Sequence, residues 1–212
     1  MQPFTVVTGI AAPLLRDDVN TDQICPVMPL RVLDPDYGAQ LFARWRRQAE
    51  ADAPFVLDRP QFRAARILVT GRNFGCGSAR ESAAWAFESF GIRCIVARSF
   101  ATLFRSNCLH NGILPLVLPD EEISRLQSKV VIADGAAPFT VDLVELRIAC
   151  PGGETIPFTF DPADRAALLD GLDEVGLTLR NADDIARWEA RCRETEPWLQ
   201  SMRRRGPAPE AS

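Results

Sequence analysis

A glycine-rich segment that ends at Glu81 carries the residues best suited to chemistry. Gly75 and Gly77 permit tight turns and a close approach of the backbone to a ligand. The run from Ser78 to Glu81 matches a capping box, with Ser78 as the N-cap residue and Glu81 at the third helical position. Free N–H groups at a helix N-terminus attract anions, and Arg80 adds a planar guanidinium in the first turn. The segment therefore predicts a site for a carboxylate or phosphate.

Two side chains of this segment have two interpretations each. Ser78 is either an ordinary N-cap, which the capping box alone favours, or a hydroxyl that exchanges a proton beside the bound anion. Cys76 is either a reactive thiol near a helix N-terminus or, as we favour, an inert loop residue with no histidine base nearby in the sequence. His110 lies beyond a short helical stretch, where a helix-end or core role is favoured over catalysis.

A second polar cluster lies between Asp17 and Pro26. Asp17, Asp18 and Asp22, together with the amide of Asn20, could bind a hard cation. No glutamate closes the loop at the spacing of a calcium site, so a calcium loop is excluded. Turn formation by Asn and Asp is the alternative, and this cluster alone does not decide between them.

The composition of the 212 residues excludes several functions. A single histidine, His110, argues against a multi-histidine zinc site, and a single lysine, Lys129, leaves almost no candidate for Schiff-base chemistry. No Gly-Lys-Ser/Thr follows the glycine-rich turn, so it is not a P-loop. Arg80 also stands where a dinucleotide fingerprint needs glycine. The net charge of -4 argues against nucleic acid as a partner. We expect no metal site in this chain.

The cysteines and the N-terminus indicate a location. None of the 6 cysteines forms a C-x-x-C pair, and several stand in apolar runs, which favours free thiols in a reducing compartment. The N-terminus has no secretory signal pattern, and no stretch is apolar enough to span a membrane. We therefore expect a cytoplasmic protein without a membrane partner.

Strands and helices alternate on both sides of the glycine-rich segment. The first clear strand is expected at 65–70, a helix from Ser78 to Gly91, and a second strand at 92–97, which implies a parallel crossover. A short helix at 102–108 and a strand at 114–118 follow. A helix is then expected after Asp120.

The remaining segments predict an antiparallel addition and flanking helices. An alternating segment at 139–148 and a strand at 156–160 are expected to form a hairpin. Asp161 and Pro162 begin one helix, and 181–184 begins the last one. The stretch 41–60, rich in arginine, looks like a long surface excursion. The fold class expected is a single α/β domain with a mixed sheet.

Three motifs, taken together, carry a family resemblance. They are N-T-D-Q-I-x-P at 20–26, N-F-G-C-G-S-x-R-E at 73–81, and S-F-A-x-x-F-x-x-N-C-x-x-N-G-x-L-P at 99–115. In this order they resemble the small subunit of 3-isopropylmalate dehydratase, which corresponds to the swivelling domain of aconitase-type iron–sulfur hydro-lyases. The resemblance extends from about Phe4 to about Ala190. It implies a β/β/α swivelling domain with a partly barrel-like sheet over 1–202. Residues 203–212 offer nothing apolar to bury, so we expect a disordered tail there.

The resemblance also implies roles for individual residues. Ser78 matches the serine that acts as the catalytic base, and Arg80 matches the arginine that binds a substrate carboxylate. The other positions that it assigns to the substrate cleft are Thr21, Asp22, Gly75, Cys76 and Gly77. It implies no cofactor in this chain, because three cysteines of a separate large subunit hold the family's [4Fe-4S] cluster.

The implied reaction is the isomerisation of 2-isopropylmalate to 3-isopropylmalate in leucine biosynthesis, with the large subunit as partner and a small dicarboxylate hydroxy acid as substrate. This chain departs from the common motif at Ala79 and Ser82, and from the usual substrate loop at 33–38. Another alkylmalate or a citraconate-type compound therefore stays open as substrate. A non-catalytic anion-binding module and a thiol enzyme using Cys76 are the alternatives from other classes.

Overall fold

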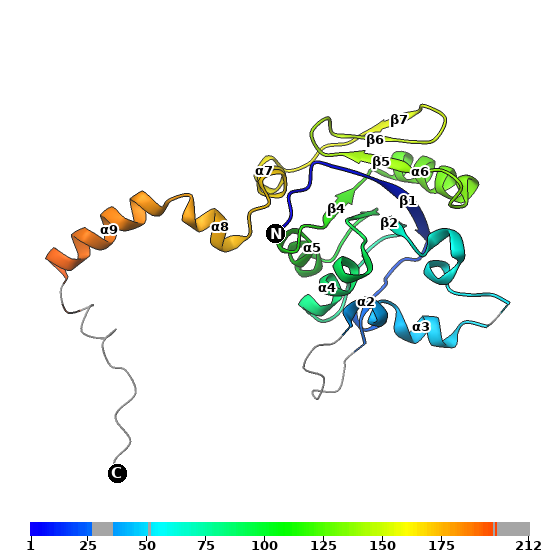
Figure 1. Ribbon diagram of the computed structural model, residues 1–212, viewed down its shortest axis with the longest axis horizontal. Helices are drawn as coiled ribbons and strands as arrows, with labels where there is room; N and C mark the ends of the chain where they lie inside the picture. The colour runs from blue at the N-terminus through cyan, green and yellow to red at the C-terminus, as the bar shows by residue number, and fades with distance from the viewer. Residues whose placement is uncertain (27–35, 51, 197, 199–212) are drawn as a thin grey trace, which may run out of the picture. The chain divides into compact units, whose positions relative to one another are not determined.

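The computed structural model describes residues 1–26, 36–50, 52–196 and 198. Within these residues seven strands form one sheet in the order β4-β3-β2-β1-β5-β6-β7 (Figure 1). The strands are β1 Val6–Leu14, β2 Ala65–Thr70, β3 Cys94–Ala97, β4 Leu114–Val117, β5 Phe139–Asp142, β6 Arg147–Ala149 and β7 Thr155–Pro157. Strands β1 to β4 pair in parallel, and β1, β5, β6 and β7 pair antiparallel. The expected α/β fold with a mixed, partly barrel-like sheet is confirmed.

Strand β1 belongs to both halves of the sheet. Its first part pairs with β5 from Val6 to Gly9, and its second part pairs with β2 from Ile10 to Leu14. A register shift between Ile10 and Ala11 separates the two parts. Such an irregularity bends and twists a strand, which allows one sheet to turn from its antiparallel to its parallel half. This strand was not predicted from the sequence, where the first clear strand was expected at 65–70.

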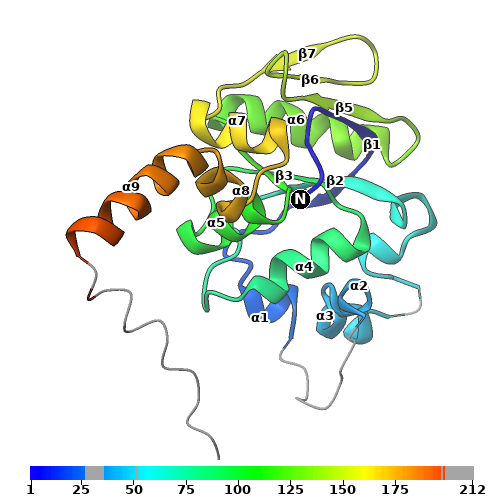
Figure 2. The ribbon, with the colours of Figure 1, turned by 60° about the vertical axis from the view of Figure 1, so that its left-hand side comes forward.

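Helices cover both faces of the parallel half. They are α1 Thr21–Ile24, α2 Tyr37–Gln40, α3 Ala43–Gln48, α4 Glu81–Phe90, α5 Thr102–His110, α6 Asp120–Ala133 and α7 Pro162–Asp170. Leu68 and Ile95 pack with α4 and α5 on one face, whereas Ile67 and Val96 pack with α6 on the other. Figure 2 shows α4 and α6 on opposite sides of β2 and β3. The predicted helices at 102–108 and after Asp120, and the strands at 92–97 and 114–118, are confirmed within a few residues.

The expectation of a surface excursion at 41–60 is wrong. Leu41 and Phe42 are fully buried, and Leu57 is buried beside them. The Phe42 ring stacks on Trp45 at 5.5 Å between centroids and meets Phe87 of α4 edge-on at 5.7 Å. The apolar residues of this segment therefore form part of the core, while its arginines lie at the surface or pair locally.

The expected hairpin at 139–160 is a three-stranded antiparallel unit instead. The alternating segment contains a turn between β5 and β6, where Leu146 has a φ of 53°. One carboxylate oxygen of Asp142 accepts hydrogen bonds from the N–H groups of Val144, at 2.9 Å, and Glu145, at 2.8 Å. An aspartate that hydrogen-bonds the backbone two residues on is a typical turn former, so the break has a local cause.

The chain divides after Asp173 into two units. In the first, α7 begins as predicted, because Asp161 accepts hydrogen bonds from the N–H groups of Ala163 and Asp164. The second contains α8 Glu174–Leu179 and α9 Ala182–Thr195, the expected last helix. The domain boundaries 1–202 and 203–212 stay a prediction, and residues 203–212 lie outside the described part of the chain.

Candidate functional site

Two loops meet at the carboxyl ends of β1 and β2. Because the strands are parallel, residues 15–20 after β1 and residues 71–80 after β2 leave the sheet at the same edge, which is where α/β folds bind ligands. The N–H of Gly75 donates to the carbonyl of Val19 at 2.8 Å, and the N–H of Thr21 donates to the carbonyl of Cys76 at 2.9 Å. The structure therefore brings the two predicted polar clusters together.

Both glycines of the turn are required by the backbone. Gly75 and Gly77 have φ values of 77° and 93°, in the region that favours glycine. A Cβ atom at Gly75 would also overlap the ring of Phe104, well inside van der Waals contact. Gly77 has room for a Cβ, so only its dihedral angle demands glycine. The predicted glycine turn is confirmed.

The start of the following helix differs from the prediction. Helix α4 begins at Glu81, and its N-cap residue is Arg80, with φ of -120° and no side-chain capping bond. Ser78 is therefore not an N-cap, and Arg80 does not lie in the first turn. The cause is a contact from the other loop, since the hydroxyl of Thr21 donates to the carbonyl of Ser78 at 2.8 Å. Thr21 is 2% exposed, whereas Ser78 is exposed at the surface.

Arg80 is held by the first loop as well. Its Nη2 atom forms an ion pair with a carboxylate oxygen of Asp22. Its Nη1 atom is buried and has no hydrogen-bond acceptor within the part of the chain that the structure describes. A buried guanidinium donor without an acceptor is costly, so this atom is suited to an acceptor supplied by a ligand or a partner.

A capping box fixes the short helix that carries Thr21 and Asp22. The side chain of Asn20 accepts a hydrogen bond from the N–H of Gln23 at 2.9 Å, and the side chain of Gln23 accepts one from the N–H of Asn20 at 2.8 Å. This cap was not predicted from the sequence, although Asn followed three residues later by Gln is its recognised pattern. The box orients both residues toward the loop after β2.

The three aspartates of the first loop have separate partners in the second. Asp17 accepts a hydrogen bond from the N–H of Arg72 at 2.6 Å, Asp18 accepts one from the side chain of Asn73 at 2.8 Å, and Asp22 pairs with Arg80. The Arg72 N–H holds the pKa of Asp17 below its ordinary value. The cluster thus connects two loops, and neither a cation site nor a simple turn describes it. Among the described residues, no group of three or more His, Cys, Asp or Glu could hold a metal.

Cys76 and His110 do not gain catalytic features. Burial and the neighbouring Asp18 raise the pKa of Cys76, which favours the inert thiol. His110 is the last residue of α5, as expected of a helix-end histidine. Helix α5 begins beside the site, where Phe100 bridges to Phe74, so His110 lies about 12 Å along the helix at 1.5 Å per residue.

Comparisons with known proteins agree on one family. Residues 1–121 match the family model of the aconitase C-terminal domain, and residues 174–201 match that of the C-terminal domain of the 3-isopropylmalate dehydratase small subunit. The 3-isopropylmalate dehydratase small subunit of Rhodospirillum centenum is 48% identical over 93% of this chain and 98% of its own length. The protein of the same name from Dinoroseobacter shibae is 46% identical over 94% of this chain and 100% of its own.

A solved structure supports the same assignment. The crystal structure of 3-isopropylmalate dehydratase from Methanocaldococcus jannaschii superposes with a TM-score of 0.62 at 26% identity, covering 86% of this chain and 99% of the other. Its similarity extends the sequence match to the arrangement of the sheet and helices. The chain therefore belongs to the family of 3-isopropylmalate dehydratase small subunits.

Proposed function

We propose that this chain is the small subunit of a heteromeric hydro-lyase that converts 2-isopropylmalate to 3-isopropylmalate in the cytoplasm, as a step of leucine biosynthesis. The names of its relatives support this function, since they are small subunits of 3-isopropylmalate dehydratase. The observation that supports it within the molecule is that Ser78 and Arg80 lie two residues apart on one loop. Thr21 and Asp22 hold this loop, through the Ser78 carbonyl and the Arg80 guanidinium.

The cluster that the family implies does not fit this chain. An iron–sulfur cluster needs several cysteine thiolates around one centre. Cys94 and Cys108 are fully buried, and burial raises the pKa of both thiols, which opposes the thiolate form. No group of three metal-binding side chains exists in the described residues. We therefore assign the [4Fe-4S] cluster to the large subunit, which leaves substrate binding and proton transfer to this chain.

In the proposed reaction Ser78 moves the proton and Arg80 holds the substrate. The oxygen of Ser78 accepts a proton from the substrate carbon next to a carboxylate, while the hydroxyl group leaves the neighbouring carbon. Water is lost and a carbon–carbon double bond forms. Water then adds with the positions of hydrogen and hydroxyl exchanged. Arg80 fits the role of carboxylate ligand because a guanidinium binds a carboxylate through two parallel hydrogen bonds.

The ion pair between Asp22 and Arg80 can be exchanged for a contact between Arg80 and the substrate. Asp22 is 55% exposed and occupies one side of the Arg80 guanidinium. A substrate carboxylate would either share Arg80 with Asp22 or replace it, and Asp22 can return to water at little cost because exposed ion pairs are weak. Arg80→Lys keeps the charge but loses the planar fork, so we expect KM to rise about tenfold with a smaller change in kcat. Arg80→Gln is expected to raise KM further.

Reconstitution tests the function as a whole. The chain is co-expressed with a cluster-bearing large subunit and assayed on 2-isopropylmalate, 2-methylmalate and citraconate. We expect a stable complex whose kcat/KM is highest for 2-isopropylmalate. A preference for citraconate or 2-methylmalate would move the assignment to another substrate of this class. A chain that binds small dicarboxylates without any partner and without turnover would instead be an anion-binding module.

A further inference from the structure

A cavity lies beside the end of β1 and the segment that follows it. It has a volume of about 580 Å³, within the range of small-molecule sites. Its walls come from the end of β1, from α3 and from the turn at η1 Val56–Asp58. The side chains that matter are Leu14, Arg16, Trp45, Phe55, Val56 and Arg59. Arg16 lies in the loop that follows β1, but its side chain lines this cavity, whereas Thr21, Asp22, Ser78 and Arg80 do not.

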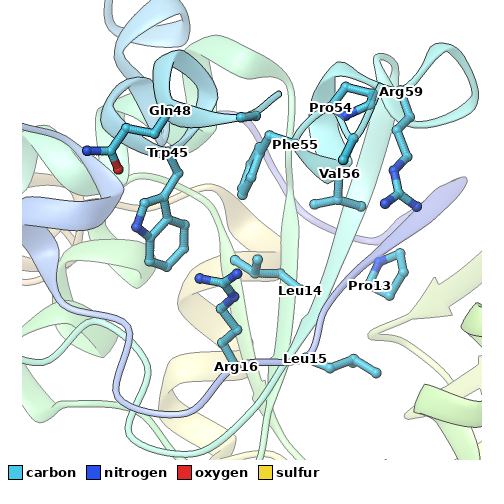
Figure 3. Close-up of a pocket in the computed structure, with 12 residues that line it drawn as sticks. Pro13, Leu14, Leu15, Arg16, Trp45, Gln48, Pro54, Phe55, Val56 and Arg59 are labelled. Carbon is cyan, nitrogen blue, oxygen red and sulfur yellow. The ribbon is translucent and has the colours of Figure 1, made fainter. Parts of the chain in front are cut away.

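The cavity combines an apolar middle with two cationic sides. The guanidinium carbon of Arg16 lies 4.7 Å from the centroid of the Trp45 ring. Figure 3 shows Arg16 beneath Trp45 on one side and Arg59 on the other, with Leu14, Phe55 and Val56 between them. A guanidinium that stacks on an aromatic ring keeps its in-plane N–H groups available for hydrogen bonds.

Neither arginine is neutralised within the described part of the chain. No ion pair or side-chain hydrogen bond of Arg16 or Arg59 occurs among those residues. Two of the neighbouring carboxylates are occupied, since Asp58 pairs with Arg46 at 2.6 Å and Asp17 accepts the N–H of Arg72 at 2.6 Å. Two positive charges therefore line the cavity without an ion-pair partner among the described residues.

The walls are held in place before any ligand binds. The carbonyl of Arg16 accepts hydrogen bonds from the N–H of Gly71 at 3.2 Å and from the hydroxyl of Thr70 at 3.3 Å. The Trp45 ring stacks on the fully buried Phe42 and contacts Phe55 at 6.0 Å between centroids. Preformed walls reduce the conformational entropy that is lost when a ligand binds.

We propose that this cavity binds a small amphipathic carboxylate, with its anionic group attracted by both Arg16 and Arg59 and a short alkyl or aryl chain over Phe55 and Val56. A guanidinium binds carboxylate through paired hydrogen bonds, and the apolar middle favours a ligand with a hydrocarbon chain over an inorganic anion. Binding there does not depend on the proposed function, because Thr21, Asp22, Ser78 and Arg80 do not line the cavity.

Three probes separate the contribution of the carboxylate charge to binding from that of the hydrocarbon chain. The full chain is labelled with ¹⁵N and titrated with hexanoate, with hexanamide, which keeps the chain but not the charge, and with acetate, which keeps the charge but not the chain. The readout is the indole N–H resonance of Trp45, assigned with Trp45→Phe. Hexanoate is expected to bind saturably and about tenfold more tightly than either control probe, since each lacks one set of contacts.

Variants identify the cationic partners. Arg16→Gln and Arg59→Gln are each expected to weaken hexanoate binding about tenfold. Arg47→Gln is the matched control, because Arg47 is an exposed residue of α3 outside the cavity, and it should bind as the parent does. The dispersion of the NMR spectrum reports whether each variant is folded. If Arg16→Gln does not fold, the binding affinity of Arg59→Gln alone tests the proposal. Linear, non-saturable shifts, equal binding of hexanamide, or unchanged binding by folded Arg16 and Arg59 variants would overturn the proposal.

Discussion

The parallel and antiparallel halves of the sheet are buried in different ways. Every residue of β3 is buried, as are five of the six in β2, because helices cover both faces there. In the antiparallel half, β5 alternates between buried and half-buried residues, and β7 buries only its central residue. The parallel half also gathers the loops that carry Ser78 and Arg80 at one edge. The comparison teaches that the half buried on both faces also carries the candidate site, while the other half contributes to the core from a single face.

The largest difference is expected between two glycines with positive φ. Gly75→Ala should lower the free energy of unfolding by about 3 kcal/mol or more, because the new Cβ meets Phe104 and the residue also adopts a disfavoured φ. Gly152, in the turn between β6 and β7, has a φ of 89° and nothing within 4 Å of a new Cβ. Gly152→Ala should therefore cost only about 1 kcal/mol. Urea unfolding of both variants checks this, and equal losses would contradict the clash at Gly75.

The second difference concerns valines. Val96→Ala in β3 removes methyl groups from a fully buried site and should cost about 2 kcal/mol. Val6→Ala, where β1 pairs with β5, changes a side chain that is 48% exposed and should cost less than about 0.5 kcal/mol. Thermal and urea unfolding measure both. If Val6→Ala were as destabilising as Val96→Ala, the two halves would not differ as described.

Two helix caps separate stability from activity. Asn20→Ala removes the capping box of α1, and Asp161→Ala removes the cap of α7, which follows the antiparallel half. Each should cost about 1 kcal/mol of stability. Only Asn20→Ala should also lower kcat/KM of the reconstituted enzyme, by about tenfold, because the cap orients Thr21 and Asp22. An equal loss of activity in Asp161→Ala would show that the caps act through stability alone.

The smallest expected difference lies in the salt dependence of two carboxyl groups. The pKa of Asp17 is lowered chiefly by the N–H of Arg72, and that of Glu154 by the side chains of Lys129 and Arg125. Because both pKa values are depressed on folding, each group stabilises the fold above its unfolded pKa and loses this effect as the pH falls through its folded pKa. Carboxyl NMR titrations in low and high salt measure both pKa values. High salt should raise the pKa of Glu154 more than that of Asp17, since salt screens exposed ion pairs. An equal or larger rise for Asp17 would contradict this assignment of causes.

Much of the parallel half could be predicted from the sequence because the residues that mark the ends of its strands are local. An apolar run at 65–70 followed by Gly71, Gly75 and Gly77 marks a strand and a turn without any knowledge of distant residues. Strand β1 was missed because Gly9 and Pro13 interrupt its apolar pattern, and proline is uncommon in a central strand. Its place in the middle of the sheet depends on pairing with β2 and β5, more than 50 residues away.

The candidate site shows the same limit at the level of single residues. Ser78 and Glu81 match a capping box, yet the hydroxyl of Thr21, 57 residues earlier, holds the Ser78 carbonyl and the helix begins later. The pairing of Asp22 with Arg80 likewise joins residues that no local pattern connects. Residue types at the site were therefore predictable from motifs, but their hydrogen-bond partners required the fold.

Ser78→Ala in the reconstituted complex tests the central claim most directly. We expect kcat to fall by a factor of about 10³ or more with little change in KM, because the variant loses the proton acceptor but keeps Arg80. Co-elution with the large subunit should be unchanged, since Ser78 contacts Thr21 only through its backbone carbonyl. Ser128→Ala, an exposed serine of α6, is the control and should retain full activity. A Ser78→Ala complex that assembles normally and turns over 2-isopropylmalate at the parental rate would contradict the assignment of Ser78 as the base.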